Sequence, residues 1–340
     1  MNKTIGALFL TAITLYSINY YLQSHSDMPN LERIAYLINK DQDSTWKAQN
    51  YPRFTYNRAQ LKRMFNLQVE SSLPSEFDEA PVHDDFDLPE NFDAREQWPE
   101  CESIREVRDQ SSCGSCWAFG AVTAMSDRIC IASGQTNQTR VSSEDLMECC
   151  SSCGSGCNGG YLYQSWAYWK RHGIVTGDLY DDKNSCKPYN FPPCSHHVNG
   201  PYESCDSVHY HTPRCKRACT NQDYTKSYSD DAVYGTRVYS VYGETQMMKE
   251  LVQHGSLEAA FSVYEDFLTY KSGVYQNRHG YSLGGHAIRI IGYGVENGVK
   301  YWLCVNSWNE TWGDNGTFKI LRGSNHCGIE DDVVGGLPQL

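Results

Sequence analysis

The sequence predicts an α+β fold with two lobes, a helical first half and a β-rich second half, which meet at a cleft. In the first half, Phe119, Val122, Met125 and Ile129 follow Cys116 at helical spacing. A second helical pattern covers residues 162–171. The second half carries strand-like runs at residues 233–241, 259–263, 286–293, 301–307 and 317–321. Helices and strands segregated along the chain in this way are typical of two packed units with a site between them.

The composition indicates a folded protein from an oxidising compartment. The chain has 340 residues, 40% hydrophobic and 21% charged, which excludes a disordered or fibrous protein. Its net charge of −12 gives no basic footprint for nucleic acid. Fifteen cysteines, none of them in the first 100 residues, favour a disulfide framework, and their odd number requires at least one free thiol.

Residues 1–26 are interpreted as a signal peptide. Lys3 precedes an apolar run from Ile5 to Tyr16. That run is shorter than the roughly 20 residues needed to cross a bilayer. A signal anchor is the alternative, but we expect entry into the secretory pathway without stable membrane insertion, and cleavage between Ser17 and Ser26.

Residues 27–87 are interpreted as a removable pro-segment. Apolar residues from Leu31 to Ile38 repeat at helical spacing, and a second short helix is predicted at Ala59 to Phe65. The tail from Pro74 to Asp87 is rich in proline and acidic residues and indicates an exposed linker. An ordinary N-terminal subdomain is the alternative interpretation. From residue 88 onward the composition shifts to cysteine, glycine and aromatic residues.

Cys116 is the candidate nucleophile. The turn formed by Gly114 and Ser115 leads directly into the predicted helix, so Cys116 lies at or just before the helix N-terminus. Free N–H groups and the helix dipole favour a negative charge there, and hence the thiolate that attacks a carbonyl carbon. The spacing Cys113-x-x-Cys116 also fits a thiol oxidoreductase, although such motifs usually belong to a small βαβ domain.

His286 is the candidate general base. It follows Gly284 and Gly285, which let another backbone approach closely, and it starts a predicted alternating strand. Asn306, at the end of another strand, offers an oxygen that can accept the imidazole N–H, and Trp308 can shield that bond from water. The alternatives are that His286, one of 11 histidines, is structural and that Asn306 is a turn residue.

Gln110 is the candidate donor to an oxyanion. Its side-chain amide lies six residues before Cys116 and, with the backbone N–H of Cys116, can hold the developing negative oxygen. One such donor is typically worth about 3–4 kcal/mol.

These positions resemble the papain family of cysteine peptidases, and within it the cathepsin B subfamily. Cys113 to Trp117 matches the Cys-Gly-[Ser/Ala]-Cys-[Trp/Tyr] signature of that family. The resemblance covers Leu88 to about Leu337 and is carried by further runs at 91–99, 157–161, 284–292, 306–308 and 312–313. Before it, residues 44–48 resemble the short pro-segment of the same subfamily.

The resemblance implies a papain-like fold, with a helical left lobe, a β-barrel-like right lobe and the active site between them. It implies hydrolysis of peptide bonds through a thioester acyl-enzyme, with endopeptidase and peptidyl-dipeptidase activity and no metal or organic cofactor. It divides the chain into a signal peptide (1–26), an inhibitory pro-segment (27–87) and a mature peptidase domain (88–340). A catalytically drifted binding protein is the alternative.

The resemblance also identifies residues 186–219, called the insert here, as an occluding loop. It implies that His196 and His197 bind the C-terminal carboxylate of a substrate and that His196 pairs with Asp109. Cys194, Cys205 and the two histidines alternatively fit a zinc site. The loop-fixing Arg–Asp pair of the subfamily is replaced by Tyr202 and Thr311. We therefore expect a looser loop and a balance shifted toward internal cleavage.

By the resemblance, six disulfides form and leave Cys116, Cys304 and Cys327 free, Cys304 and Cys327 having structural roles. The implied pairs are Cys101–Cys130, Cys113–Cys157, Cys149–Cys215, Cys150–Cys153, Cys186–Cys219 and Cys194–Cys205.

Substrate binding is assigned more loosely. The resemblance places Asp332 at the floor of the pocket for the second residue before the cut, where it would admit Arg; a solvated surface Asp is the alternative. Leu162 replaces the usual Pro of that pocket wall. Gly159 and Gly160 are expected to pair with extended substrate. Asn137, Asn309 and Asn315 begin N-x-Thr glycosylation patterns.

The implied partners are peptide and protein substrates, the chain's own pro-segment and cystatin-type inhibitors. We expect a monomer, with no nucleic acid partner. The implied location is the lysosome or the outside of the cell, including a digestive lumen.

Overall fold

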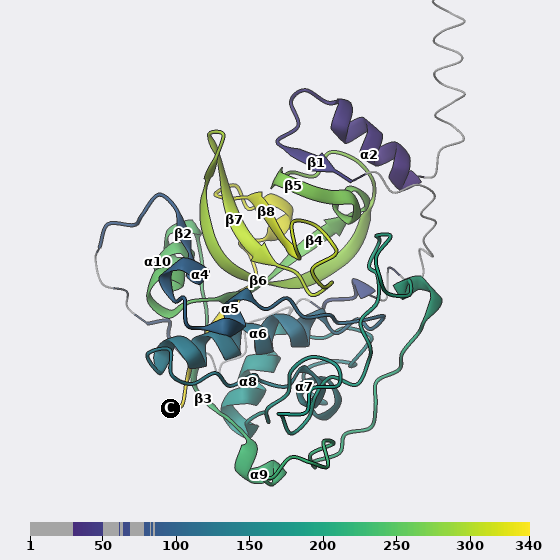
Figure 1. The fold of residues 1–340 in the computed structure, drawn as a ribbon. Helices are drawn as coiled ribbons and strands as arrows, with labels where there is room; N and C mark the ends of the chain where they lie inside the picture. Colours follow the sequence, from purple (N-terminus) through teal and green to yellow (C-terminus); the bar gives the residue numbers. More distant parts are fainter. Residues whose placement is uncertain (1–29, 50–60, 62–63, 69–77, 82, 84–85) are drawn as a thin grey trace, which may run out of the picture.

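The computed structural model describes residues 30–49, 61, 64–68, 78–81, 83 and 86–340. The predicted signal peptide and half of the linker at residues 74–87 lie outside these residues. Figure 1 shows a helical layer below a curved sheet, with the N-terminal segment against the far end of the sheet. The helices are α2 (Asn30–Lys40), α4 (Ala94–Gln97), α5 (Glu102–Arg105), α6 (Cys116–Ala132), α7 (Ser143–Cys149), α8 (Leu162–His172), α9 (Tyr228–Asp231), α10 (Glu244–His254) and the 3₁₀ turns η1 (Cys205–Ser207), η2 (Glu265–Thr269) and η3 (His326–Gly328). The strands are β1 (Trp46–Ala48), β2 (Phe92–Asp93), β3 (Gly235–Ser240), β4 (Leu257–Tyr264), β5 (Tyr270–Tyr275), β6 (Ser282–Glu296), β7 (Val299–Val305), β8 (Thr317–Leu321) and β9 (Val333–Pro338).

The first lobe is built around α6, as the apolar spacing predicts. Every residue of α6 from Cys116 to Cys130 is buried, because α7 and α8 pack on one side and the sheet on the other. The predicted second helix is confirmed as α8, which ends at Gly173 in a backbone conformation with positive φ. The two lobes meet where α6 packs against β6.

The second lobe is one sheet with the strand order β1-β5-β8-β7-β6-β4-β9-β3, and β2 pairs with β6 beside this path. All five predicted strands form, as β3, β4, β6, β7 and β8. The sheet is curved but open, since β1 and β3 end the order without pairing to each other, which agrees with the expected two-lobed α+β fold in which the second lobe is barrel-like.

Strand β6 begins earlier than predicted. It starts at Ser282, so His286 is inside the strand and not at its start. Residues 286–294 are buried without alternation, because the strand is covered on both faces. This position fixes the His286 backbone through pairing with Phe261 of β4.

The core of the second lobe is aromatic. Phe267 lies 4.9 Å from Phe318 and 5.0 Å from Trp312, measured between ring centroids. Trp308, which ends the site-bearing stretch after β7, packs edge-on against Trp312 at 4.9 Å. These contacts of the aromatic core fix the position of the residues that follow β7.

The N-terminal segment docks as an extra strand and helix. The predicted helix at residues 31–38 is confirmed as α2, whose apolar residues are buried against the sheet lobe. Strand β1 pairs antiparallel with β5, and the Trp46 indole donates to the carbonyl of Gln276 at 2.9 Å. The second predicted helix, at residues 59–65, lies partly outside the described residues; Leu61, Met64 and Phe65 are described and buried.

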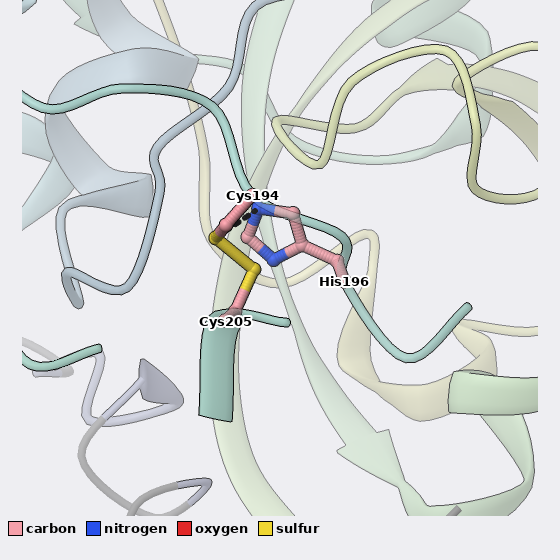
Figure 2. A group of neighbouring side chains, drawn as sticks. All are labelled: Cys194, His196 and Cys205. Carbon is pink, nitrogen blue, oxygen red and sulfur yellow. Dashed lines mark hydrogen bonds between the residues drawn. A yellow bond between two sulfur atoms is a disulfide. The ribbon is translucent and has the colours of Figure 1, made fainter. Parts of the chain in front are cut away.

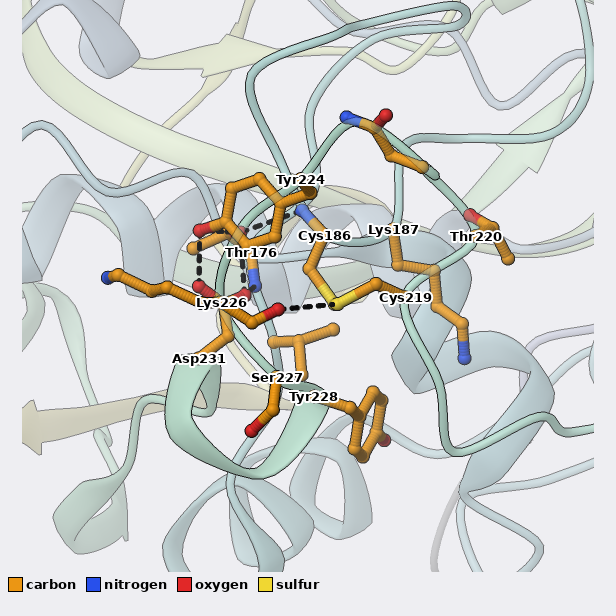
Figure 3. The surroundings of a disulfide bond; sticks show 12 residues. Thr176, Cys186, Lys187, Cys219, Thr220, Tyr224, Lys226, Ser227, Tyr228 and Asp231 are labelled. Atoms are coloured by element: carbon orange, nitrogen blue, oxygen red, sulfur yellow. Dashed lines mark hydrogen bonds between the residues drawn. A yellow bond between two sulfur atoms is a disulfide. The ribbon is translucent and has the colours of Figure 1, made fainter.

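The insert has little regular structure, and disulfides fix its ends. Cys186 and Cys219 close its base (Figure 3), beside a network in which Thr176 donates to Asp231 at 2.7 Å and accepts from the Cys186 N–H at 3.1 Å. Within residues 186–219, the only helical turn is η1. Among the described residues, no helix is long and apolar enough to cross a membrane.

Candidate active site

Cys116 is the first residue of α6 and faces the second lobe. The disulfide between Cys113 and Cys157 and the bond from the Gly114 N–H to the Cys157 carbonyl (2.9 Å) hold the loop that leads into the helix. The backbone N–H groups of Ala287, the residue after His286, and of the helix start act on the Cys116 sulfur and oppose the rise of its pKa. Because Cys113 bonds to Cys157 while Cys116 is free, the Cys-x-x-Cys redox pair does not exist.

His286, Asn306 and Trp308 come together as the sequence predicts. The Nε2 of His286 lies 2.8 Å from the Oδ1 of Asn306. An amide oxygen only accepts, so Nε2 carries the proton and Nδ1 is left as an acceptor; Nδ1 has no hydrogen-bond partner among the described residues. The buried Trp308 ring lies 5.0 Å from the imidazole and covers it.

Gln110 is held in place by hydrogen bonds to Ser307, on the opposite side of the cleft. Its backbone N–H donates to the Ser307 carbonyl at 2.9 Å, and its Oε1 accepts from the Ser307 hydroxyl at 2.7 Å. Its Nε2 donates to the Cys113 carbonyl at 2.8 Å. An amide nitrogen carries two hydrogens, so one N–H remains to hold an oxyanion at this position.

Burial keeps the two reactive groups neutral in this form of the protein. It raises the pKa of the Cys116 thiol to about 12, against the lowering effect of the N–H groups at the helix start. It lowers the pKa of His286 to about 4, although the bond to Asn306 opposes this shift. The thiolate expected from the helix N-terminus is therefore not the state of this covered cleft, because loss of water outweighs the helix dipole.

The N-terminal segment is what covers the cleft. The Phe65 ring lies edge-on to His286 at 5.6 Å and to Trp308 at 5.8 Å. Asn66 bridges to Gly285, and the Gln68 N–H donates to the Gly160 carbonyl at 3.0 Å. Residues 65–68 thus lie between the two walls that bear the candidate residues.

Glycines on both walls make room for this backbone. A Cβ on Gly159 would overlap the Asn66 carbonyl, and a Cβ on Gly284 would overlap the Phe65 carbonyl. Both glycines also have positive φ. Close approach of another backbone, predicted for Gly284 from its sequence, is thereby confirmed.

The two histidines of the insert are buried over Trp308. The Nε2 of His196 lies 2.6 Å from Asp109 Oδ1, and its ring stacks on Trp308 at 5.8 Å. His197 meets Trp308 edge-on at 5.2 Å, and burial lowers its pKa to about 3. Both rings therefore belong to the cleft that also contains His286.

Zinc binding in the insert is excluded by its disulfide. Cys194 and Cys205 are joined by a bond of 2.01 Å, and the His196 ring lies beside it (Figure 2). Disulfide sulfurs are not thiolates and do not hold zinc. Of the two histidines, His196 is directed to Asp109.

Asn309 has a structural contact that its glycosylation pattern did not suggest. Its Nδ2 donates to Asp109 Oδ2 at 2.7 Å and to the Cys194 carbonyl at 2.8 Å, and the residue is 7% exposed. A glycan replaces one of the two hydrogens on this nitrogen, so it would remove at least one of these bonds. Asn137 and Asn315 are exposed, so glycosylation there stays a prediction.

Asp332 is half-buried and lies near a carboxyl group that sequence reasoning missed. Its charge contributes to a pKa of Glu258 well above the usual range, although burial of Glu258 is the main cause. The Trp166 indole donates to Glu258 at 2.7 Å. Glu258 stands in an apolar run of β4, so only the three-dimensional structure brings it to Asp332.

This geometry agrees with comparisons to known proteins. The chain belongs to the papain family of cysteine proteases, since the model described as "Papain family cysteine protease" matches residues 88–337. It is 54% identical over 259 residues to cathepsin B-like cysteine proteinase 6 of Caenorhabditis elegans, covering 75% of this chain and 68% of that protein. It is 44% identical over 338 residues to a cathepsin B-like cysteine proteinase of Schistosoma japonicum, covering 96% and 98%.

A solved structure gives the same result. Procathepsin B S9 of Trypanosoma congolense superposes with a TM-score of 0.77 at 33% identity, covering 90% of this chain and 97% of that one. The protein is therefore a cysteine protease similar to cathepsin B, and its structure resembles that of a precursor in which the N-terminal segment is still present.

Proposed function

We propose that Cys116 and His286 carry out the proteolysis. Once the cleft is open, Nδ1 of His286 takes the proton of the Cys116 thiol. The resulting thiolate attacks the peptide carbonyl carbon, and Gln110 and the Cys116 N–H hold the oxyanion. The C–N bond then breaks while His286 gives its proton to the leaving amine, which produces a thioester. His286 next takes a proton from water, the water oxygen attacks the thioester, and the acid product leaves with Cys116 restored.

One observation carries this assignment: Cys116 lies so near the segment of His286 that the backbone N–H of Ala287, the next residue, lowers the pKa of the thiol. The same imidazole is fixed through Nε2 by Asn306, so Nδ1 is the nitrogen that can exchange a proton. Asn306 is thus assigned as the residue that positions the base, with Trp308 excluding water from their bond.

Residues 27–87 are proposed to be an inhibitory pro-segment, preceded by a signal peptide at 1–26 and followed by the mature domain at 88–340. Support comes from residues 65–68, which lie in the cleft and bury both reactive groups. A leader of this type would bring the enzyme into the secretory pathway, for a lysosomal or extracellular role.

Removal of C-terminal dipeptides is proposed to use the insert. His196 and His197 lie over Trp308 in the same cleft as His286, where an imidazolium can pair with a substrate carboxylate. The other end of the cleft is proposed to bind substrate through the Gly159–Gly160 backbone and Asp332. The Gln68 N–H already pairs with Gly160 in the way a substrate would.

The test is peptidase activity after acid activation. The Cys116→Ala chain should lose all detectable hydrolysis, whereas Cys304→Ala, which removes a free buried thiol of the second lobe, should retain it. Asn306→Ala should lower kcat/KM by about 10–100-fold, since a hydrogen bond to a charged group is worth about 1.5–3 kcal/mol. Normal activity of folded Cys116→Ala would refute the assignment.

A further inference from the structure

A second cluster of metal-ligating side chains lies away from the cleft. His83, Glu250 and His254 place one ligand atom each within 4.8 Å of one another. His83 belongs to the proposed pro-segment, whereas Glu250 and His254 are on α10 of the peptidase domain. The cluster therefore joins two parts of the chain that processing would separate.

The hydrogen bonds of His83 direct a lone pair at Glu250. Its Nδ1 lies 2.6 Å from the Oε1 of Gln253, an oxygen that only accepts, so Nδ1 carries the proton. Its Nε2 lies 3.2 Å from Glu250 Oε2. In the neutral ring, a nitrogen lone pair then faces a carboxylate oxygen, an arrangement that calls for a cation between them.

Glu250 is held as a ligand would be. The residue is fully buried; its Oε1 accepts from the Tyr239 hydroxyl at 2.7 Å and pairs with Arg128 at 2.9 Å. Its Oε2 has no hydrogen-bond partner among the described residues and is directed at His83. Arg128 contributes positive charge at Oε1, so an ion would be held by Oε2 and two neutral imidazoles.

The separation of His83 from Glu250 and the donor types fit zinc, and His254 is near enough to complete the set, within 4.8 Å of both. Tetrahedral Zn²⁺ has bonds of about 2.0–2.1 Å to nitrogen and oxygen, which puts neighbouring ligand atoms about 3.3 Å apart. The distance from His83 Nε2 to Glu250 Oε2 already has this size. Two imidazoles and one carboxylate favour Zn²⁺ over Ca²⁺ or Mg²⁺, which take mainly oxygen ligands.

The surrounding contacts also match those of zinc sites. Ligating histidines usually donate their other N–H to an oxygen, as His83 does to Gln253, and ligating carboxylates are themselves hydrogen-bonded, as Glu250 is by Tyr239. Three protein ligands leave the fourth position of the ion to water.

We propose that the unprocessed chain binds one Zn²⁺ through His83, Glu250 and His254, and that the ion fastens the end of the N-terminal segment to α10. The statement that processing removes the site rests on the proposed function of residues 27–87. The proposal that zinc binds does not rest on that function, because the experiment measures metal uptake and not peptidase activity.

The test uses the chain from residue 27 onward, which keeps His83, and carries Cys116→Ala so that the cleft thiol neither cleaves the chain nor binds metal. Calorimetric titration with Zn²⁺ near pH 7.5 should give one equivalent. His83→Ala and His254→Ala should each abolish it, and Gln253→Ala should weaken it by about 10–100-fold. His172→Ala, which removes an exposed histidine of α8, should bind like the parent chain.

A second measurement keeps the proposal testable if a variant folds poorly. Co²⁺ added to the parent should give the visible absorption of a tetrahedral site, and Zn²⁺ should raise the Tm of the parent but not of His83→Ala. Equal zinc binding by the parent and His83→Ala would overturn the proposal. The proposal would also be overturned if the parent chain binds no zinc and is stabilised only by acid. A proton on His83 Nε2 would then join it to Glu250 without a metal ion.

Discussion

The two lobes that form the cleft are stabilised by different means. All six disulfides lie between Cys101 and Cys219, in the lobe made of short helices and the insert. Residues 220–340, all of which the structure describes, contain none, and Cys304 and Cys327 there are free. That part is a continuous sheet over an aromatic core.

The difference follows from what each lobe can bury. Long irregular segments, such as the insert, form few regular hydrogen bonds and pay a large entropy cost on ordering, which cross-links reduce. A paired sheet with large aromatic side chains gains enough from burial without cross-links. The reactive pair therefore joins a covalently braced wall, which holds Cys116, to a wall held by packing, which holds His286.

The largest expected effect is a loss of stability in the wall that is held by packing. Phe318→Ala removes a fully buried ring that contacts Phe261, Phe267 and Trp312, and should lower the free energy of unfolding by about 3–5 kcal/mol. Denaturant unfolding measures it. Tyr281→Ala, at a residue 70% exposed, is the control and should change little. A loss below about 1 kcal/mol in Phe318→Ala would contradict the packing account.

The next effect tests whether the disulfides stabilise the first lobe in proportion to the length of the loops that they close. Replacing Cys101 and Cys130 by alanine opens a loop of 29 residues and should cost about 3–4 kcal/mol. The matched control replaces Cys150 and Cys153, whose separation is only 3 residues, and should cost about 1.6 kcal/mol. Equal losses in unfolding experiments would show that loop entropy is not the reason for the braced wall.

The third expected effect is a pH dependence of the closure of the N-terminal segment over the cleft. Closure of the N-terminal segment lowers the pKa of His286 from 6.5 to about 4 through burial, so the closed form binds fewer protons than the open form. Closure is therefore fully favourable above pH 6.5 and weakens as the pH falls toward 4, by up to about 1.4 kcal/mol per unit. The burial shift of His197 acts in the same direction.

Hydrogen exchange at residues 64–68 of the Cys116→Ala chain, corrected for intrinsic rates, measures this closure. Protection should fall between pH 7 and 5, and His286→Gln should flatten the dependence. Protection that rises in acid would show that other groups control the opening.

The smallest effect concerns the insert. Tyr202, which is 44% exposed, and Thr311 stand where the subfamily has an Arg–Asp pair. The double change Tyr202→Arg and Thr311→Asp should raise the ratio of dipeptidase to endopeptidase activity by about 1.5–5-fold, as expected for a surface ion pair of about 0.2–1 kcal/mol. Each single change is the control and should have less effect. An unchanged ratio would mean that Asn309 and the disulfides already fix the loop.

Local patterns in the sequence predict much of this arrangement. Cys116 at a helix start, Asn306 at a strand end and the helices α2 and α8 all follow from spacing and turn residues. His286 is placed inside its strand because β6 continues back to Ser282, which a run of glycines hides from pattern reading. The neutral state of the pair also escaped prediction, since it depends on burial, and His286 is covered in part by Phe65, which lies 221 positions away along the chain.

Contacts between distant segments explain the other misses. Asn309 looks like a glycosylation site until the fold brings it to Asp109 and Cys194. Glu258 looks like an accidental charge in an apolar strand until Trp166 bonds to it. His83 is more than 160 positions from Glu250 and His254 along the chain, and only the position of α10 brings them together.

Pairing of β1 with β5 has a consequence for the protease after activation. If processing removes residues 27–87, as proposed, β5 (Tyr270–Tyr275) becomes an edge of the sheet, and its unpaired backbone amides are open to solvent or to another extended chain. The kink at Gly273 and the charge of Lys271 interrupt that edge, features that typically discourage one sheet from adding to the next. The segment that we propose to be an inhibitor thus also covers, in the unprocessed chain, a sheet edge to which another extended chain could add.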